Sequence, residues 1–410
     1  MKRRILICMA VMLLSLLMCG NLWAESSGSC GDNITWTLDD DDNLTLTGSG
    51  QMADYNETYE RPWSDNVKTV KFAGDITGIG SSAFRGCSSL ESIEIPNSVT
   101  SIGYAAFEYC SRLKKVYITD LSAWCRITFN FYLANPLSYG GALYLNGKEV
   151  KDLVIPDDVT KIGKRAFSGC SSLSSVTIPN SVTSIGNSAF DGCSSLTSVT
   201  IGNSVKSIGN SAFNGCSSLS SVSIGNSVTE IDNYAFDGCS SLTSIEIPNS
   251  VTSIGNSAFW NCSSLTSVTI GNSVTSIGNS AFWNCNSLKK ITVNATTPPD
   301  CCDYIFEGVD YSSCVLVVPD ESISAYKNKS PWNQFLNISE VENVINDNEV
   351  SVKVDNGNIV VTGTADDLNM EVYNISGSRI YSGIVKSVQV PTAGLYLVKV
   401  LDKSYKIMVR

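Results

Sequence analysis

The chain has 410 residues, 43% of them hydrophobic, which is long enough for two or three domains. It contains no histidine, so histidine-based triads, histidine acid–base catalysis and most zinc sites are excluded. Its net charge of −11 disfavours nucleic acid and anionic membrane surfaces, because no run of cations is present to neutralise phosphates. We therefore predict no nucleic-acid partner, and no residue pattern predicts a cofactor.

The first 24 residues are predicted to form a secretory signal peptide. Residues 2–4 are Lys-Arg-Arg, and they precede an apolar run from Ile5 to Met18 that is too short to cross a bilayer. Residues 22–24 (Leu-Trp-Ala) provide a cleavage site. Lipidation of Cys19 is an alternative, although the residue before it is larger than a lipobox accepts. No other apolar stretch is long enough to span a membrane, so we expect no transmembrane span in the mature chain.

Residues 25–72 are predicted to form a cap of β-hairpins. Polar and apolar residues alternate over Ile34–Leu38 and Leu44–Thr47, and Asp39–Asn43 joins the two segments. Four adjacent carboxylates suggest a calcium site, but the Asp-x-Asp-x-Asp-Gly spacing of a calcium loop is missing, which favours a solvated turn. A cap is needed because the end of a repeat stack exposes apolar core and an unpaired strand edge.

Residues 73–336 are organised by a repeat. An Ala-Phe pair recurs every 23 residues, and a fixed period of this length is typical of a leucine-rich-repeat solenoid. The regular phenylalanines are Phe167, Phe190, Phe213, Phe236, Phe259 and Phe282, with an earlier pair at Phe84 and Phe107 and a displaced copy at Phe306. Each repeat begins with a Leu-x-x-Val-x-Ile strand, turns at Pro-Asn or Gly-Asn, and continues through a second extended segment to a short helical or 3₁₀ turn. One coil cannot bury its own apolar face, whereas stacked coils can.

The repeat resembles the BspA-type leucine-rich repeats of bacterial surface proteins. The pattern Cys-Ser-Ser-Leu-x-Ser-Val-x-Ile-Pro-Asn-Ser-Val-Thr-x-Ile-Gly-x-x-Ala-Phe carries this resemblance over residues 73–336. The resemblance implies a solenoid with a parallel β-sheet along one side, and secretion or surface display that is often linked with adhesion. Gly31–Trp36 is similar to the N-terminal cap of the family, and Ala325–Lys327, Trp332 and Phe335 are similar to its terminal cap. The resemblance implies no catalytic residue.

The repeat is interrupted once. Phe107 and Phe167 are 60 residues apart where two coils would take 46, so about 14 extra residues lie within an insert near 118–150. The insert is rich in aromatic residues, and Asn146-Gly147 predicts a tight hairpin turn. The aromatic residues either fill the gap that a longer coil creates or form a protruding binding element.

Candidate ligand-binding residues lie where the repeat varies. The outward positions of the strands hold serine or threonine in most coils, and near the N-terminus they hold Glu94, Lys115 and Tyr117. Trp260 and Trp283 follow the phenylalanines of the last two regular coils, in a position that should face solvent. The two tryptophans either bind a ligand or are covered by the C-terminal cap or the next domain. Paired carboxylates and an activated nucleophile are both missing, so we predict that the chain is not an enzyme.

Eight cysteines occupy one position of the repeat. They are Cys87, Cys110, Cys170, Cys193, Cys216, Cys239, Cys262 and Cys285. Ligands stacked about 4.8 Å apart in one row do not form a tetrahedron, and parallel side chains are poorly oriented for disulfides. We predict free, buried thiols packed against the phenylalanines and no metal site. Near the end of the repeats, at most one disulfide is predicted, from Cys314 to Cys301 or Cys302.

The C-terminal third is predicted to contain a cap, a linker and a small β-sandwich. Residues 294–336 form the cap, with a closing strand at Val315–Val318 and a capping helix near residues 322–332, and residues 337–348 form a polar linker. Residues 349–410 contain short alternating segments typical of a sandwich. These segments are Val350–Val354, Ile359–Thr362, Met370–Tyr373, Val388–Val390, Leu395–Val400 and Tyr405–Val409.

Part of this last domain looks like the C-terminal sorting domain of type IX secretion cargo. The similar segments are Val372–Gly377, Ala393–Val400 and Lys406–Arg410, although the Pro-Asn-Pro opening frequent in such domains is absent. The resemblance implies an extracellular protein, or one attached to the outer-membrane surface. We predict a monomer that binds another protein, on a host or a neighbouring cell, or mediates adhesion. The alternative is a surface protein that captures glycans through Trp260, Trp283 and the insert.

Overall fold

The computed structural model describes residues 26–56, 60–302, 304–340, 345–347, 350–355, 358–363, 369–375, 377–384, 387–400 and 403–409. The predicted signal peptide, Cys19 and part of the predicted linker lie outside these residues. The chain divides into two compact units. The first contains the described residues up to Leu316 together with Ser324–Asn337, and the second contains Val317–Ile323 together with the described residues from Ile338 onward.

The first unit begins with the predicted hairpins. Its first strands are β1 (Ser26–Gly31), β2 (Ile34–Leu38) and β3 (Asn43–Gly48), which pair antiparallel in that order. The four aspartates form an exposed turn in which Asp39 Oδ1 accepts hydrogen bonds from the backbone N–H groups of Asp41 (3.0 Å) and Asn43 (2.8 Å). On its other edge β3 pairs in parallel with β5 (Thr69–Ala73), so the last strand of the hairpins is also the first strand of the solenoid sheet.

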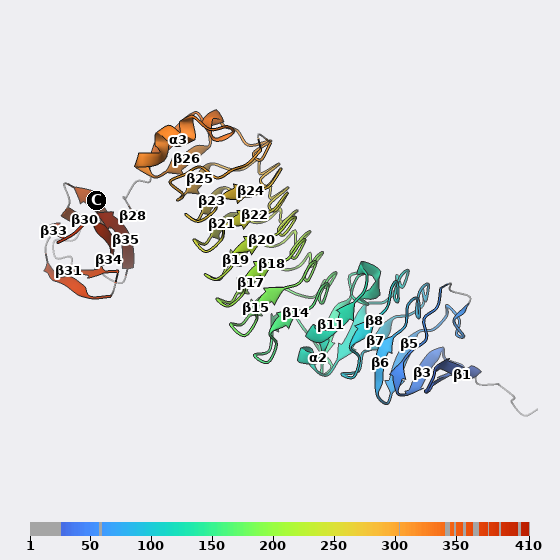
Figure 1. Ribbon diagram of the computed structural model, residues 1–410. Coiled ribbons are helices and arrows are strands. Elements are labelled where there is room, and N and C mark those ends of the chain that lie inside the picture. The colour runs from blue at the N-terminus through green and yellow to red at the C-terminus, as the bar shows by residue number, and fades with distance from the viewer. Residues whose placement is uncertain are drawn as a thin grey trace, which may run out of the picture. The chain divides into compact units, whose positions relative to one another are not determined.

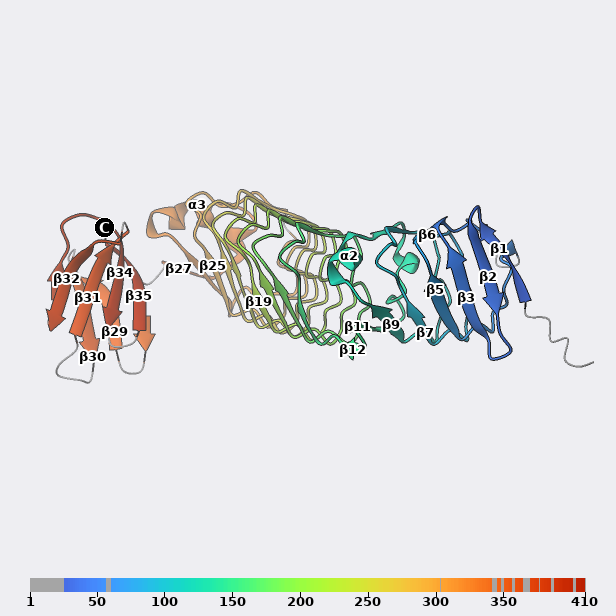
Figure 2. The same ribbon diagram turned by 90° about the horizontal axis from the view of Figure 1, so that it is seen from below.

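Each coil of the solenoid contributes one longer and one shorter strand (Figures 1 and 2). After β5 the longer strands are β7 (Ser92–Glu94), β9 (Lys115–Ile118), β11 (Ala142–Leu145), β13 (Asp152–Val154), β15 (Ser175–Ile178), β17 (Ser198–Ile201), β19 (Ser221–Ser223), β21 (Ser244–Ile247), β23 (Ser267–Ile270) and β25 (Lys290–Val293). The shorter strands are β4 (Gly50–Gln51), β6 (Ile76–Ile79), β8 (Ser101–Ile102), β10 (Thr128–Phe129), β14 (Lys161–Ile162), β16 (Ser184–Ile185), β18 (Ser207–Ile208), β20 (Glu230–Ile231), β22 (Ser253–Ile254) and β24 (Ser276–Ile277).

Strands of neighbouring coils pair in parallel, and paired residues are separated by the repeat period, as in Ser175↔Ser198 and Ser184↔Ser207. The predicted leucine-rich-repeat solenoid is confirmed.

The phenylalanines form a stack along the core. From Phe167 to Phe282 successive ring centroids lie 5.2–5.3 Å apart with ring planes within 8° of parallel. Phe306 continues the stack at 5.7 Å from Phe282, as its displaced position in the sequence predicted. From Phe190 to Phe282 each ring contacts the rings of the coils on either side, so this part of the core consists of contacts between neighbouring coils.

The turn at each phenylalanine is built on two left-handed residues and is not helical. Ser211, two residues before Phe213, has φ 54°, and Gly215, two residues after it, has φ 66°. In the last two regular coils Asn261 (φ 58°) and Asn284 (φ 59°) replace this glycine, and asparagine tolerates the left-handed region better than most residues. A residue with positive φ on each side of the phenylalanine prevents a helical run from forming there.

The predicted row of buried thiols is confirmed, and most of its members are hydrogen-bonded to the neighbouring coil. Cys193 Sγ donates to the carbonyl of Phe167, 26 residues earlier, at 3.1 Å. The same bond joins Cys110 to Phe84, Cys216 to Phe190, Cys239 to Phe213, Cys262 to Phe236 and Cys285 to Phe259, at 3.0–3.3 Å. Arg61 stands 26 residues before Cys87, where a phenylalanine would be expected, and its buried guanidinium donates from Nη1 to Cys87 Sγ at 3.0 Å.

Burial makes the thiol row sensitive to alkaline pH. Desolvation raises the pKa of Cys239 well above the unperturbed 9.0, because the thiolate would lie among apolar side chains. The folded chain therefore keeps this proton at a pH where the unfolded chain releases it. The stabilising contribution of the protonated thiol is complete below pH 9 and is lost as pH rises from 9 toward the folded pKa.

We expect the destabilisation caused by Cys239→Ala to be smaller at pH 10 than at pH 8. Between these pH values the wild-type chain should lose about 1 kcal/mol that the variant, which has no thiol at this position, does not lose. Urea unfolding of both proteins at the two pH values measures the difference, with Ser241→Ala as the control. An identical Cys239→Ala effect at pH 8 and pH 10 would show that burial does not raise this pKa.

The one disulfide that the sequence allowed, from Cys314 to Cys301 or Cys302, is not formed, since all thirteen described cysteines are free thiols. The residues lie on different sides of the last coil. Asp300, next to Cys301, bridges to Ser276 in the row of shorter strands. Val315, next to Cys314, donates its N–H to the carbonyl of Lys289 beside the row of longer strands.

The insert forms an enlarged coil that keeps the register of the solenoid. It contains α2 (Leu121–Arg126), β10, η2 (Tyr132–Ala134) and β11, with β10 paired in parallel with β8 and β11 with β9. In a regular coil the carbonyl of the alanine before the phenylalanine accepts a hydrogen bond from the backbone N–H of the phenylalanine in the preceding coil. Phe167 donates to Ala189 in this way. The insert has no such phenylalanine, and the carbonyl of Ala166 accepts instead from Trp124 Nε1 (2.9 Å) and Asn135 Nδ2 (3.2 Å).

Two aromatic residues of the insert belong to the core. Trp124 and Phe129 are 1% and 2% exposed, which confirms the gap-filling interpretation for these two side chains. The predicted tight turn is also present, since Asn146 (φ 50°) and Gly147 (φ 78°) join β11 to β12 (Lys148–Glu149) in an antiparallel hairpin.

The C-terminal end of the stack is covered by aromatic side chains, as predicted. Phe306 contacts Trp332 and Phe335, each at a centroid distance of 5.3 Å, and Tyr326 Oη donates to the carbonyl of Ala295 at 2.8 Å. The elements of this region are β26 (Val315–Val318), η3 (Asp320–Ser322), α3 (Ile323–Lys327) and η4 (Trp332–Gln334). The capping helix is shorter than predicted because it ends at Lys327.

The second unit contains the predicted β-sandwich. Its strands are β27 (Asn337–Glu340), β28 (Ile345–Asp347), β29 (Val350–Asp355), β30 (Asn358–Gly363), β31 (Asn369–Asn374), β32 (Arg379–Ile384), β33 (Ser387–Gln389), β34 (Gly394–Val400) and β35 (Lys403–Val409). Two four-stranded sheets, ordered β28-β29-β30-β33 and β32-β31-β34-β35, enclose a core that includes Val352, Val361, Val372, Val398 and Ile407. Of these strands β27, β28 and β32 were not predicted, and β27 and β28 lie within the predicted linker.

Candidate functional site

The first candidate site lies on the outer face of the sheet, over β7, β9 and β11. Glu94 and Tyr117 are register partners, and so are Tyr117 and Tyr144. Successive side chains of a strand point to opposite faces, and Val116 is buried, so Tyr117 and its partners project outward. Lys115 lies two residues before Tyr117 and projects from the same face. The structure thus brings Glu94, Lys115 and Tyr117 together.

Tyr144 completes this site and was not among the predicted site residues. Its ring centroid lies 5.0 Å from that of Tyr117, so the two tyrosines form one aromatic surface beside Glu94 and Lys115. The signal that could have identified Tyr144 is the alternation Leu143-Tyr144-Leu145, whose central residue faces outward when Leu143 is buried. We call these four residues the tyrosine patch.

Trp260 and Trp283 lie on a different part of the coil. They follow the phenylalanines in the turns, and their ring centroids are 6.1 Å apart. Both side chains are half-buried, whereas the sequence predicted a solvent-facing position. Among the described residues no acceptor reaches the buried Nε1 of Trp260. The tryptophans and the tyrosine patch therefore form two separate surfaces of the first unit.

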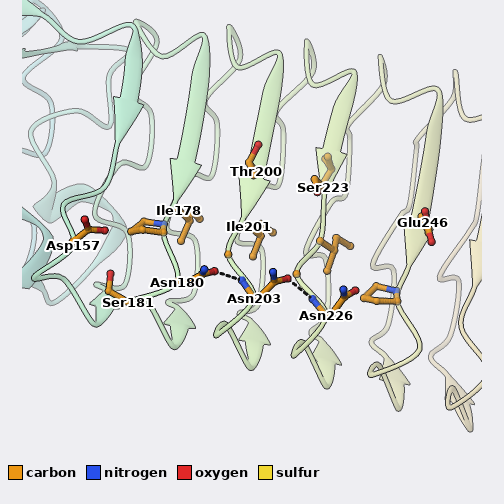
Figure 3. Close-up of a pocket in the computed structure, with 16 residues that line it drawn as sticks. Asp157, Ile178, Asn180, Ser181, Thr200, Ile201, Asn203, Ser223, Asn226 and Glu246 are labelled. Carbon is orange, nitrogen blue, oxygen red and sulfur yellow. Dashed lines mark hydrogen bonds between the residues drawn. The ribbon is translucent and has the colours of Figure 1, made fainter. Parts of the chain in front are cut away.

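A groove of about 740 Å³ runs along the sheet face of the regular coils (Figure 3). Along one side lies a row of asparagines in which the backbone N–H of Asn203 donates to Asn180 Oδ1 (2.7 Å) and that of Asn226 donates to Asn203 Oδ1 (3.0 Å). The charged residues that line it are Asp157 and Glu246, and among the described residues no lysine or arginine does. The groove is therefore polar and acidic.

In the described part of the chain, no group of three or more cysteine, aspartate or glutamate side chains is arranged to hold a metal ion. Within the same residues, no helix has the length and apolar character needed to cross a membrane.

Comparison with known proteins identifies the repeat. The family model described as BspA type leucine-rich repeat region matches six copies, over residues 60–132, 141–265 and 208–329. A search of curated proteins finds no significant match.

Solved structures with similar folds include three bacterial leucine-rich repeat proteins. A leucine-rich repeat protein from Eubacterium ventriosum is 22% identical, with 70% of this chain and 95% of that chain covered and a TM-score of 0.44. A leucine-rich cell surface protein from Faecalibacterium prausnitzii is 24% identical (76% and 93% covered, TM-score 0.41), and a leucine-rich repeat protein from Bacteroides ovatus is 23% identical (76% and 90% covered, TM-score 0.41). The family match spans well over half of the 410 residues, and the chain belongs to the BspA-type leucine-rich repeat family.

Proposed function

We propose that this chain is a secreted or cell-surface repeat protein that binds another protein through the outer face of its solenoid sheet. The observation that carries the proposal is the tyrosine patch, where Glu94, Lys115, Tyr117 and Tyr144 stand on a face that holds serine or threonine at most outward positions of the regular coils. Tyrosine is enriched among the residues that dominate interface energy, whereas serine and threonine contribute little. The patch also presents both signs of charge, which supports recognition of a protein surface.

The remaining parts of the proposal rest on the sequence. Residues 1–24 have the pattern of a signal peptide, and the second unit has the sandwich fold to which the sorting-domain resemblance points. We infer export of the chain followed by surface attachment or release, and a binding role without catalysis. Detection of the chain in culture medium or on intact cells, with its N-terminus beginning after Ala24, tests this part.

Replacing Tyr117 and Tyr144 together by threonine is expected to weaken partner binding at least tenfold, or about 1.4 kcal/mol, because two neighbouring aromatic anchors are lost. Threonine fills the same position at Thr177 and Thr200, so the fold should be retained. Purified host and neighbouring-cell surface proteins would be screened by biolayer interferometry against the full chain, with Thr177→Ser as the control. A bound partner whose affinity is unchanged in the double variant would contradict the proposed site.

The glycan alternative is favoured by a different observation, the pair of tryptophan rings at 6.1 Å. The same assay separates the two functions. Binding through the tryptophans would be lost in a Trp260→Ala, Trp283→Ala variant that still folds, and free sugar would compete. Binding through the tyrosine patch would survive both tests.

A further inference from the structure

The row of longer strands is interrupted at one place within the regular coils. β17 pairs with β19 and β21 pairs with β23, but β19 and β21 belong to different sheets. Two core residues are half-exposed at this interruption, Val222 and Ile224. Their counterparts one coil earlier, Val199 and Ile201, are 2% and 3% exposed. The core is therefore open to solvent between β19 and β21.

The interruption coincides with a step from glycine to proline. The coils approach closely between Gly202 and Gly225, since a Cβ placed on Gly225 would lie 2.2 Å from the carbonyl oxygen of Gly202. In the next coil the equivalent residue is Pro248, whose ring needs more room than a glycine at the same corner and whose nitrogen has no hydrogen to donate. Proline itself does not prevent strand pairing. Pro156 and Pro179 occupy this corner in two neighbouring coils, and their strands β13 and β15 are paired from Asp152↔Ser175 to Val154↔Thr177.

The opening lies in the floor of the acidic groove. Val222, Ile224 and Pro248 line the groove together with Glu246, which takes the place of the threonine found at Thr200 in the same row (Figure 3). An apolar floor next to a carboxylate distinguishes this position from the rest of the Ser/Thr face. We call these four residues the seam.

We propose that the seam is a docking point for an extended, basic segment of a protein partner. An apolar side chain of the segment packs on Val222 and Ile224, and a lysine or arginine beside it pairs with Glu246. A basic segment is complementary in charge to the groove, because the groove is lined by two carboxylates and by no lysine or arginine among the described residues. The proposal rests on the proposed function, since it requires the sheet face to bind protein, but it concerns a place separate from the tyrosine patch.

The test uses the full chain and three fluorescein-labelled, end-capped nonapeptides in an anisotropy titration at low ionic strength. The first has alternating Ser/Thr and lysine around a central leucine, the second has glutamate in place of lysine, and the third has serine in place of the leucine. The first peptide should bind at least about tenfold tighter than the second, and also tighter than the third. Equal binding of the basic and acidic peptides, or no binding of any peptide, overturns the proposal.

Two variants of the seam address its geometry and its charge. Pro248→Gly restores the residue present at Gly225 and Gly271, so it should close the ladder and weaken binding of the first peptide about tenfold while Glu246 remains. Glu246→Thr should weaken binding about threefold, as expected for a partly exposed ion pair. Pro179→Gly is the matched control, because its strand already has a complete ladder.

Hydrogen exchange distinguishes the possible failures. Amides of residues 221–224 and 243–247 should exchange more slowly in Pro248→Gly than in the wild-type chain. If they do and peptide affinity is unchanged, docking at the seam is excluded. If the ladder does not close, the Glu246→Thr variant and the leucine-free peptide still test the proposal, because unchanged affinity in both would contradict docking at the seam. The Tyr117→Thr, Tyr144→Thr variant should bind the peptide normally, so failure of the seam proposal leaves the tyrosine-patch assay unaffected.

Discussion

Replacing Phe236 by alanine is expected to destabilise the solenoid locally by about 3–5 kcal/mol. The ring is fully buried and stacks at 5.3 Å on both Phe213 and Phe259, so its removal leaves a cavity bordered by three coils. Solenoid contacts join only neighbouring coils, so the loss should appear as local opening. Native-state hydrogen exchange should accelerate most in the coils that contain these three rings.

A matched control for this substitution lies two residues earlier in the same turn. Tyr234 is 37% exposed, and serine occupies its position in adjacent coils. Tyr234→Ser should therefore change stability by no more than about 0.5 kcal/mol. Exchange that accelerates uniformly from residue 73 to residue 336 in Phe236→Ala would show that the solenoid opens as one unit, which contradicts the nearest-neighbour interpretation.

Replacing Trp124 by alanine is expected to cost about 3–5 kcal/mol and to open the enlarged coil. The indole fills the core of that coil against Phe129, at a centroid distance of 5.5 Å, and donates to Ala166. Trp124→Phe keeps an aromatic ring but removes the donor, and it should cost about 1–2 kcal/mol because Asn135 still donates to the same carbonyl. Urea unfolding and hydrogen exchange over residues 118–170 measure both effects.

An exposed residue of the insert provides the control for Trp124. Lys148 lies at the tip of the β11–β12 hairpin, and Lys148→Ala should have little effect. If Trp124→Ala were as mild as Lys148→Ala, the insert would be an appendage that the stack does not need. The gap-filling interpretation would then fail despite the burial of the indole.

The repeated parts of the fold were predictable because each position is set by the same local chemistry in every coil. The period predicted the phenylalanine stack and the buried cysteine row, and the family resemblance implied the parallel sheet. The hydrogen bonds from six of the eight thiols to a phenylalanine carbonyl were not predicted, since they depend on the rise between coils. The turn at each phenylalanine was misjudged because serine at position 211 and its equivalents gives no sign of a positive φ.

The candidate site was predictable only in part. Glu94, Lys115 and Tyr117 depart from the Ser/Thr pattern and could be identified from it, whereas Tyr144 belongs to a strand whose register was hidden by the insert. The half-burial of Trp260 and Trp283 depends on their contact with each other and on the surrounding turns. The seam could not be predicted, because Pro248 conforms to the repeat consensus and the sequence does not show which strand ladder is interrupted.

The constant separation of bonded residues has a consequence for the length of the molecule. Hydrogen bonds between regular coils join residues 22, 23, 24 or 26 positions apart, as in Phe190 to Ala212, Thr197 to Ser174, Gly209 to Ile185 and Cys216 to Phe190. Deleting residues 194–216 would therefore replace every bonding partner by its equivalent in the next coil. Each coil gained or lost changes the distance between the N-terminal and C-terminal caps of the solenoid by about 4.8 Å, the spacing of neighbouring strands. The distance between the two ends of the solenoid can therefore change in fixed steps while both ends stay the same.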